Sequence, residues 1–265
     1  MKDISLKPGK RVRMEDFDPD DTSLVPGGKQ QAAKRNVDIQ KRLTEGQELL
    51  FASSSQAVLI ILQGMDTSGK DGTIRHVMGP FNPQGVQVTS FKKPTPTELA
   101  HDFLWRAHLA APGKGEIAVF NRSHYEDVLI VRVHDLVPKK VWKKRYQQIN
   151  DFERLLVQSG TVVLKFFLHI SKDEQRKRLQ ERCDDPKKRW KFQHGDLEER
   201  KLWDDYMDAY RDALEKTSTD WAPWHVVPAN PKWFRNYVVG SIVADALDDL
   251  KLKYPKIELG EVVIE

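Results

Sequence analysis

Cysteine is nearly absent from this sequence, since Cys183 is the only one among 265 residues. A single cysteine excludes an intramolecular disulfide and a cysteine-rich zinc site, and it suits a reducing compartment. The chain also lacks any apolar run approaching the ~18 residues of a membrane span, and residues 1–21 contain no apolar core of a secretion signal. We therefore expect a cytoplasmic protein with no membrane partner.

A large excess of charge of one sign is also missing. The 43 Lys and Arg residues stand against 39 Asp and Glu residues, which gives a net charge of only +4. Because the whole chain is not a polycation, we expect no nucleic-acid partner, and charge should act locally. With 39% apolar residues, the chain is long enough to bury one large core.

The domain organisation follows from a change in composition near residue 28. Residues 1–28 are charged and turn-rich and end in Pro26-Gly27-Gly28, so they are interpreted as an N-terminal extension. From Lys29 onwards, apolar runs typical of strands alternate with helical patterns, and residues 29–265 are interpreted as one domain. We expect strands at 58–62, 85–91, 115–122, 161–171 and 224–230, and helices at 29–51, 97–111, 142–156, 172–183 and 197–216.

Strands that alternate with helices predict an α/β fold with a parallel sheet covered on both faces. Ligands of such a sheet bind beyond the carboxyl ends of its strands. In the helix expected at 97–111, Leu99, Phe103 and Leu104 are predicted to face the core.

The segment "GMDTSGKDGT" lies between a buried strand and a helix. Its spacing, Gly64-x-x-x-x-Gly69-Lys70, is that of a P-loop except that Asp71 stands where Ser or Thr is usual. In such a loop, backbone N–H groups surround an anion, the next helix adds its positive end, and the lysine adds a charge. The predicted phosphate-binding residues are Gly64, Thr67, Ser68, Gly69, Lys70, Asp71, Gly72 and Thr73.

Two other polar segments leave strand ends, "FKKPT" at 91–95 and "NRSHYED" at 121–127. Arg122 can grip phosphate oxygens in a bidentate manner. Phosphoryl transfer requires a magnesium-binding carboxylate, yet Asn121 occupies the position of the expected acid. Asp66 is therefore the first candidate ligand, Asp127 the second and Asp71 the third. The predicted catalytic residues are Asp66, Lys70, Arg122 and Asp127, and the predicted nucleotide-binding residues are Lys92, Asn121, Arg122 and Glu126.

The segment 176–191, "RKRLQERCDDPKKRWK", has eight basic and three acidic residues, a local excess of five positive charges. Arg178 and Arg182 are four residues apart and share a helix face, so they could close over an extended anion. A solvated helix face is the alternative interpretation. The position after the fourth strand favours a lid over about 172–201, with Arg178, Arg182, Lys188 and Arg189 as its predicted phosphate contacts.

At these residues the sequence resembles the type-2 polyphosphate kinase family. The loop "GMDTSGKDGT" is similar to that family's altered P-loop, "FNRSHYEDVLIVRV" to its second motif, and "RLQERCDDPKKRWKF" to its lid. The similarity extends from about Lys29 to the C-terminus and includes "HDFLWRAH", "TSTDWAPWHVVPAN" and, in the extension, "KPGK".

The resemblance implies a three-layer P-loop kinase fold, similar to thymidylate kinase, with a helical lid. It also implies magnesium-dependent transfer, with Mn²⁺ as a substitute, between inorganic polyphosphate and nucleotides. In this family Asp regularly follows the loop lysine, and the acid at Asp66 is essential. Lys70 and the loop amides then hold the reacting phosphate, Arg122 contacts phosphate on the nucleotide side, and Arg178 with Arg182 line the polyphosphate path.

The family divides by acceptor, and Asn121, His124, Glu126 and Asp127 make this chain similar to the class that accepts both AMP and ADP. The ADP-only class has Asp at position 121 and Trp-Tyr-Asn-Arg further on. GMP and GDP are further candidate substrates, and we expect a homo-oligomer. Two alternatives stay open: an ATP-dependent nucleoside monophosphate kinase, and a P-loop protein that binds nucleotide without turnover.

Overall fold

A five-stranded parallel sheet runs through the centre of the computed structural model, which describes residues 4–258. The strands are β1 (Ala57–Gln63), β2 (Val86–Ser90), β3 (Ile117–Asn121), β4 (Thr161–His169) and β5 (Trp224–Pro228). Their order is β2-β3-β1-β4-β5, and each neighbouring pair is parallel. Every residue of β1 is buried, which explains its uninterrupted apolar sequence. The predicted α/β fold with a parallel sheet is confirmed.

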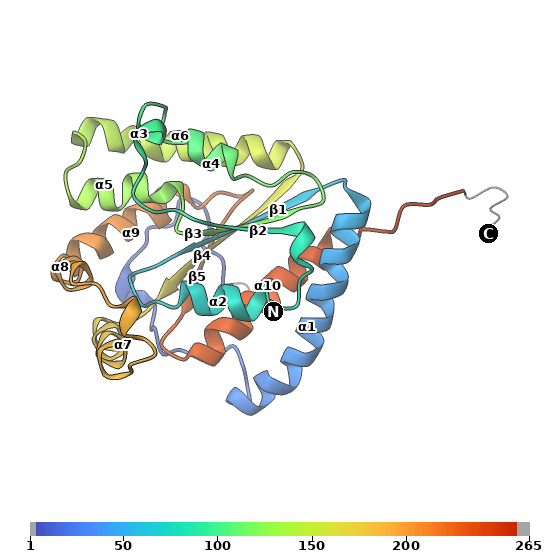
Figure 1. Ribbon diagram of the computed structural model, residues 1–265, viewed down its shortest axis with the longest axis horizontal. Helices are drawn as coiled ribbons and strands as arrows, with labels where there is room; N and C mark the ends of the chain where they lie inside the picture. Colours follow the sequence, from blue (N-terminus) through green and yellow to red (C-terminus); the bar gives the residue numbers. More distant parts are fainter. Residues whose placement is uncertain (1–3, 259–265) are drawn as a thin grey trace.

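Helices cover both faces of the sheet (Figure 1). One layer contains α1 (Gly28–Ser53), α2 (Lys70–Val77) and α10 (Lys232–Asp249). The other contains α3 (Pro96–Leu99), α4 (Trp105–Leu109), α5 (Ile130–Val133), α6 (Lys139–Gln158) and α9 (Trp203–Thr217). The segment predicted to be a lid follows β4 and comprises α7 (Lys172–Asp184), the short helix η4 (Arg189–Lys191) and α8 (Gly195–Lys201). The remaining short helices are η1 (Met14–Asp16), η2 (Pro83–Gly85) and η3 (His124–Val128).

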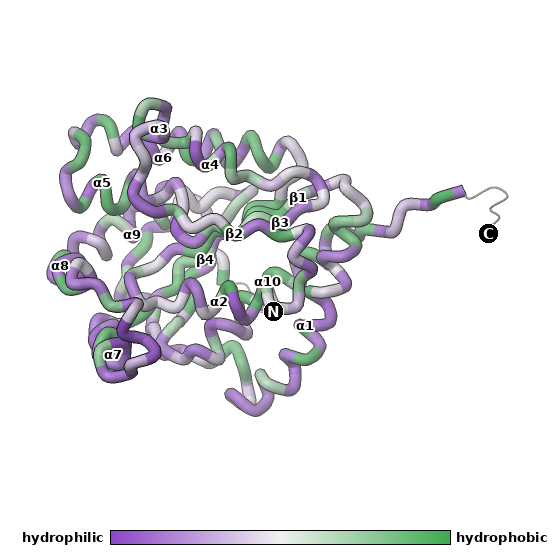
Figure 2. The backbone as a smooth tube through the Cα atoms, in the orientation of Figure 1, coloured by the Kyte–Doolittle hydropathy of each residue, from purple (hydrophilic) through white to green (hydrophobic). Residues whose placement is uncertain are grey.

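Figure 2 shows how hydropathy follows this architecture: the central strands are hydrophobic, whereas α7 is hydrophilic along most of its length. The core extends from the sheet to the inner faces of both helical layers. No helix of residues 4–258 is long and apolar enough to cross a membrane.

The single helix predicted at 97–111 is wrong. The structure has two short helices there, α3 and α4, because Thr95 caps the first and the Asp102 carboxylate accepts a hydrogen bond from the Leu104 N–H at 3.0 Å. Leu99, predicted to face the core, is 68% exposed. Phe103 and Leu104 pack against the core as expected.

The N-terminal extension packs against the edge of the sheet. The Leu6 N–H donates to the Trp224 carbonyl oxygen at 2.7 Å, and Ser5 forms a bridge with His225. Leu6, Val12 and Val25 are buried in the main core. Ser5 and Leu6 thus cover part of the β5 edge, which would otherwise expose unpaired backbone groups.

Candidate active site

The turn between β1 and α2 has the backbone geometry of an anion-binding loop. Gly64 and Gly69 have φ angles of 151° and 102°, which favour glycine. A Cβ atom added at Gly64 would lie 2.7 Å from the carbonyl oxygen of Leu168, so no larger residue fits there. The loop then enters α2, whose first residue is Lys70, and the helix directs its free N–H groups back toward the loop.

Three hydroxyl groups of this loop and the first turn of α2 lack partners. Thr67 Oγ1, Ser68 Oγ and Thr73 Oγ1 are buried and form no hydrogen bond with any residue between 4 and 258. A buried polar group without a partner costs about 1–3 kcal/mol. Hydroxyl groups donate readily to phosphate oxygens. The loop therefore fits a phosphate group that would satisfy these donors.

Lys70 is buried beneath the loop rather than exposed on it. Its Nζ donates to the carbonyl oxygens of Gly64 at 2.7 Å and Met65 at 3.2 Å. Burial, together with the nearby Arg122 charge, lowers the pKa of Lys70 to about 8, against the opposing effect of Asp66 and neighbouring acids. The ammonium group thus holds the start of the loop and places its charge at the loop's centre.

Arg122 turns from the end of β3 toward the same loop. Its φ of 61° is unusual for a residue other than glycine, and such strain is typical of functional sites. The Arg122 Nη2 donates to Asp66 Oδ1 at 2.6 Å. Although burial opposes its charge, Glu126 and Asp66 hold the pKa of Arg122 above its ordinary value. Arg122 and Asp66, which come from two separate motifs, therefore form a charged pair at the mouth of the loop.

Asp71 does not point into the loop. Its Oδ1 accepts a hydrogen bond from Asn121 Nδ2 at 2.8 Å, and its Oδ2 lies 3.8 Å from Lys191 Nζ. The side chain is 68% exposed. Asp71 thus joins α2 to the end of β3 and to η4, which gives a structural reason for an acid where P-loops usually carry Ser or Thr. This placement does not support Asp71 as a third metal ligand.

The two acids of the "NRSHYED" segment face different partners. Glu126 Oε1 accepts from Gln63 Nε2 at 3.1 Å, and its charge acts on Arg122 and Lys70. Asp127 Oδ1 instead accepts from Arg145 Nη1 of α6 at 2.8 Å. Burial raises the pKa of Asp127 to about 6. Contrary to our expectation for Asp127, Glu126 is therefore the acid that shares the charged cluster with Asp66.

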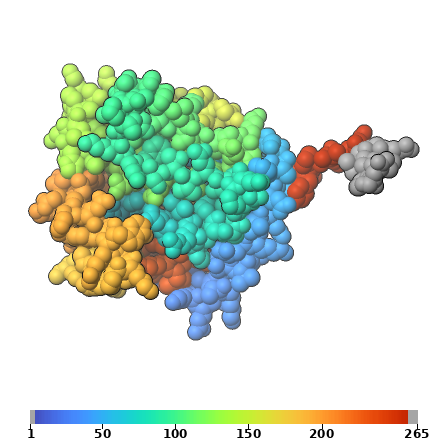
Figure 3. Space-filling view, in the orientation of Figure 1, coloured from blue at the N-terminus to red at the C-terminus, as the bar shows by residue number. Residues whose placement is uncertain are grey.

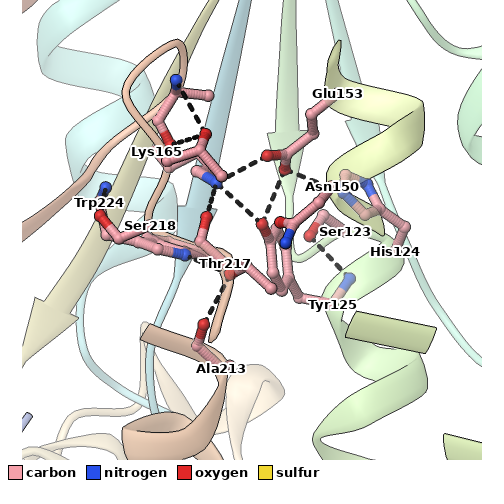
Figure 4. A network of polar contacts seen from close by, with 12 residues as sticks. Ser123, His124, Tyr125, Asn150, Glu153, Lys165, Ala213, Thr217, Ser218 and Trp224 are labelled. Carbon is pink, nitrogen blue, oxygen red and sulfur yellow. Dashed lines mark hydrogen bonds and ion pairs between the residues drawn. The ribbon is translucent and has the colours of Figure 1, made fainter. Parts of the chain in front are cut away.

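His124 and Tyr125 of the same segment point into the core, where they join a buried network (Figure 4). Lys165 Nζ donates to Glu153 Oε2 at 2.6 Å, to Tyr125 OH at 3.0 Å and to the Thr217 carbonyl oxygen at 2.6 Å. The Tyr125 hydroxyl donates to Glu153 Oε1 at 2.7 Å, and His124 Nε2 lies 3.3 Å from the same oxygen.

All four ionisable side chains of this network are fully buried. A buried charge is tolerated only with partners such as these. Burial lowers the pKa of His124, so its imidazole is neutral. His124 and Tyr125 thus anchor η3 from beneath, while Arg122 and Glu126 on either side turn toward the P-loop.

Arg178 does not lie on an open face of the lid. It is 5% exposed, and its guanidinium donates to the carbonyl oxygens of Thr67 at 2.9 Å and Ser68 at 3.2 Å. Further bonds reach the carbonyl oxygens of Ala229 and Asn230 and the Glu174 carboxylate. We expected Arg178 to line the polyphosphate path, but all its donors are engaged behind the P-loop. Helix periodicity predicted the shared face with Arg182 and gave no sign of this burial.

The other predicted lid cations lie further out. Arg182 Nη1 donates to Asp196 Oδ2 at 3.2 Å, Lys188 pairs with Asp185 at 3.0 Å, and Arg189 Nε donates to the Cys183 carbonyl oxygen at 2.8 Å. Lys188 and Arg189 are exposed. In Figure 3 the predicted lid segment forms an orange block beside the green surface of the segment after β2, with a hollow between them. Lys92, two residues after β2, is exposed, and its contact with a nucleotide stays a prediction.

Asp66 together with substrate phosphates would hold a divalent metal at this site. Residues 4–258 contain no group of three or more His, Cys, Asp or Glu side chains that could hold a metal ion. Mg²⁺ typically binds one or two carboxylates and completes its shell with water and substrate phosphates. Asp66, partly exposed beside the phosphate-binding loop, has the oxygen donors for this role. The site therefore suits phosphoryl transfer assisted by a metal–phosphate substrate.

Comparisons with known proteins agree with this chemistry. The family model described as Polyphosphate kinase 2 matches residues 27–255. The chain is 55% identical over 267 residues to an AMP/ADP-polyphosphate phosphotransferase of Meiothermus ruber, with 100% of each chain covered. It is 52% identical over 228 residues to an ADP-polyphosphate phosphotransferase of Rhodopseudomonas palustris, which covers 82% of this chain and 79% of that one.

A comparison with solved structures also finds a polyphosphate kinase 2 enzyme. The crystal structure of Polyphosphate Kinase 2 from Arthrobacter aurescens TC1 superposes with a TM-score of 0.94 at 48% identity, covering 97% of this chain and 92% of that chain. Sequence similarity, overall fold and the geometry of the P-loop thus point to one group of enzymes. The chain belongs to the polyphosphate kinase 2 family.

Proposed function

We propose that this enzyme transfers phosphoryl groups reversibly from inorganic polyphosphate to AMP and ADP, which yields ADP and ATP. The observation that carries the proposal is a P-loop whose three buried hydroxyl groups have no partner among residues 4–258. The Meiothermus ruber relative, which matches this chain over its full length and is named an AMP/ADP-polyphosphate phosphotransferase, supports the choice of donor and acceptors.

The residues around the loop have distinct roles in this proposal. The loop amides and Lys70 bind the phosphoryl group in transfer and stabilise its charge, the main form of catalysis in phosphoryl transfer. Arg122, fixed by Asp66, orients the phosphate on the acceptor side. Mg²⁺, or Mn²⁺ in its place, would be held by Asp66 and would neutralise phosphate charge when bound. The Glu126 carboxylate adds negative charge beside Arg122 and Lys70.

The rival ATP-dependent monophosphate kinase is tested by a comparison of donors. The purified protein is incubated with AMP and magnesium, with either long-chain polyphosphate or ATP as the sole donor. We expect a much larger kcat/KM with polyphosphate. Efficient transfer from ATP to AMP with no turnover of polyphosphate would favour the rival, and binding without turnover of either donor would favour a nucleotide-binding protein.

Asn121 is proposed to influence acceptor choice. Its amide donates to Asp71 at 2.8 Å, so Asn121→Asp would place two carboxylates in contact and add negative charge on the acceptor side. We expect this variant to change the ratio of kcat/KM values for AMP and ADP more than it changes the KM for polyphosphate. Asn121→Ala, which removes the bond without adding charge, is the matched control. An unchanged acceptor ratio in the Asp variant would contradict this role.

The pH dependence should report the charge of Lys70. Because burial lowers its pKa to about 8, the unliganded enzyme loses this positive charge as the pH rises through 8. The kcat/KM for polyphosphate reports the free enzyme and should fall above this value, by about tenfold per pH unit. A bound phosphate favours the charged lysine, so the fall in kcat should occur at higher pH. Profiles of kcat/KM and kcat that stay flat to pH 10 would contradict this assignment.

The exposed lid cations are proposed to recognise the donor's length. Polyphosphate carries about one charge per residue, so Lys188 and Arg189 can meet phosphates beyond the reacting one. The double variant Lys188→Gln/Arg189→Gln keeps polarity, and we expect it to raise the KM for long chains more than the KM for AMP. Lys41→Gln/Lys34→Gln on α1 is the control for lost charge. Equal KM values for the lid variant and the wild type at every chain length would contradict the proposed contacts of Lys188 and Arg189 with the polyphosphate chain.

A further inference from the structure

Arg235 of α10 is a buried cation that the sequence motifs did not identify. It is 3% exposed and lies directly behind the P-loop, where a Cβ atom added to Gly69 would be 1.8 Å from its Nη1. The Nη1 donates to the Ser68 carbonyl oxygen at 3.2 Å, and Nε and Nη2 donate to Asn236 Oδ1 at 3.1 and 2.8 Å. Among residues 4–258, Arg235 forms no ion pair with a carboxylate.

This arrangement is costly in the unliganded protein. Burial and the nearby Arg178 lower the pKa of Arg235 to about 10, so the guanidinium is still charged at neutral pH. Arg178 has a carboxylate partner, Glu174 at 2.7 Å, whereas Arg235 has only neutral acceptors. A buried charge without an opposite charge destabilises a fold unless something compensates for it.

The position of Arg235 behind the P-loop indicates that an anion bound at the front of the loop compensates its charge. The carbonyl oxygens of Asp66, Thr67 and Ser68 accept hydrogen bonds from Gln175, Arg178 and Arg235, all behind the loop. Because these carbonyls are held on the rear side, the loop N–H groups are free to converge on an anion at the front. The two guanidinium groups therefore fix the loop's backbone and add positive potential to its anion-binding side.

We propose that Arg235 is a positioning residue whose unpaired buried charge is compensated by the donor phosphates, acting through the P-loop backbone. This inference rests on the proposed function, because the compensating anion is the polyphosphate donor. In its absence Arg235 destabilises the fold, and its benefit is recovered when phosphate binds. Arg235 thus lowers the stability of the unliganded enzyme and raises its affinity for phosphate and its turnover.

The test combines stability with kinetics in Arg235→Met and Arg235→Lys. Without ligand, Arg235→Met should have a Tm equal to or above that of the wild type, because an uncompensated buried charge is removed. The rise in Tm caused by tripolyphosphate should shrink, and kcat/KM for polyphosphate should fall by about ten- to a hundredfold. Arg235→Lys retains the charge and should recover part of both ligand effects.

Arg42→Met is the matched control, since Arg42 also packs on α10 but is paired with Asp245 and Asp248. It should lower the unliganded Tm and leave kcat/KM unchanged. A packing role for Arg235 predicts the same pattern for Arg235→Met, and that result would overturn the inference, as would a Lys variant no better than Met. If Arg235→Met does not fold, the Arg235 charge does not destabilise the unliganded protein, and the proposal fails. If the wild type neither binds nor uses polyphosphate, the proposed function fails instead.

Discussion

Lys70→Ala is expected to lower kcat by about 10²-fold or more, the loss typical when a group that stabilises transition-state charge is removed. Lys70 is the cation at the centre of the P-loop, and its Nζ holds the carbonyl oxygens of Gly64 and Met65. The substitution therefore removes a charge and also two contacts that shape the loop. The measurement is steady-state kinetics with AMP and long-chain polyphosphate.

Lys70 is buried, so its substitution also tests whether the fold depends on this side chain. The fold should survive, since the hydrophobic core does not depend on this side chain, but the loop should be less ordered. Circular dichroism should match the wild type, and Lys41→Ala, an exposed change on α1, should retain full activity. Retention of more than about a tenth of wild-type kcat in Lys70→Ala would contradict the role given to the P-loop.

Asp66→Asn is expected to reduce kcat by a similar factor, about 10²-fold or more. The carboxylate forms the 2.6 Å ion pair with Arg122 and is the proposed metal ligand, so an amide weakens both functions while keeping the size of the side chain. Activity is measured over a range of Mg²⁺ concentrations. A loss that persists at saturating Mg²⁺ indicates that the geometry around Arg122 is essential.

Asp127→Asn provides the comparison for Asp66. Because Asp127 pairs with Arg145 of α6, its replacement should reduce kcat far less than Asp66→Asn does. If extra Mg²⁺ fully restored Asp66→Asn, metal affinity rather than the Arg122 pair would be the missing element. An Asp127→Asn variant as inactive as Asp66→Asn would contradict the placement of the acidic cluster at Asp66 and Glu126.

The sequence predicted the sheet and the P-loop well because both depend on local patterns. Buried parallel strands require continuous apolar runs, such as Val58–Leu62, and the Gly64 and Gly69 positions require glycine because of their φ angles. The break between α3 and α4 was missed because the apolar positions of 97–111 have a helical period, and a local turn in which the Asp102 carboxylate accepts from the Leu104 N–H overrides it.

The site was predicted less completely because side-chain direction depends on tertiary packing. The neighbours Glu126 and Asp127 look equivalent in the sequence, yet the turn of η3 sends one toward Arg122 and the other toward Arg145. Arg178 matched a lid motif but lies behind the loop. Arg235 lies far from the P-loop in sequence and belongs to no recognised motif, so only the packing of α10 brings it to Ser68.

The most direct test of the proposed function is the formation of labelled ADP and ATP from labelled AMP, with long-chain polyphosphate and Mg²⁺ present and no ATP added. We predict that the wild type forms ADP first and ATP after it, and that Lys70→Ala forms neither at more than about a hundredth of the wild-type rate. If the wild type forms no labelled ADP from polyphosphate, or if Lys70→Ala forms it equally fast, polyphosphate-dependent transfer at this P-loop is contradicted.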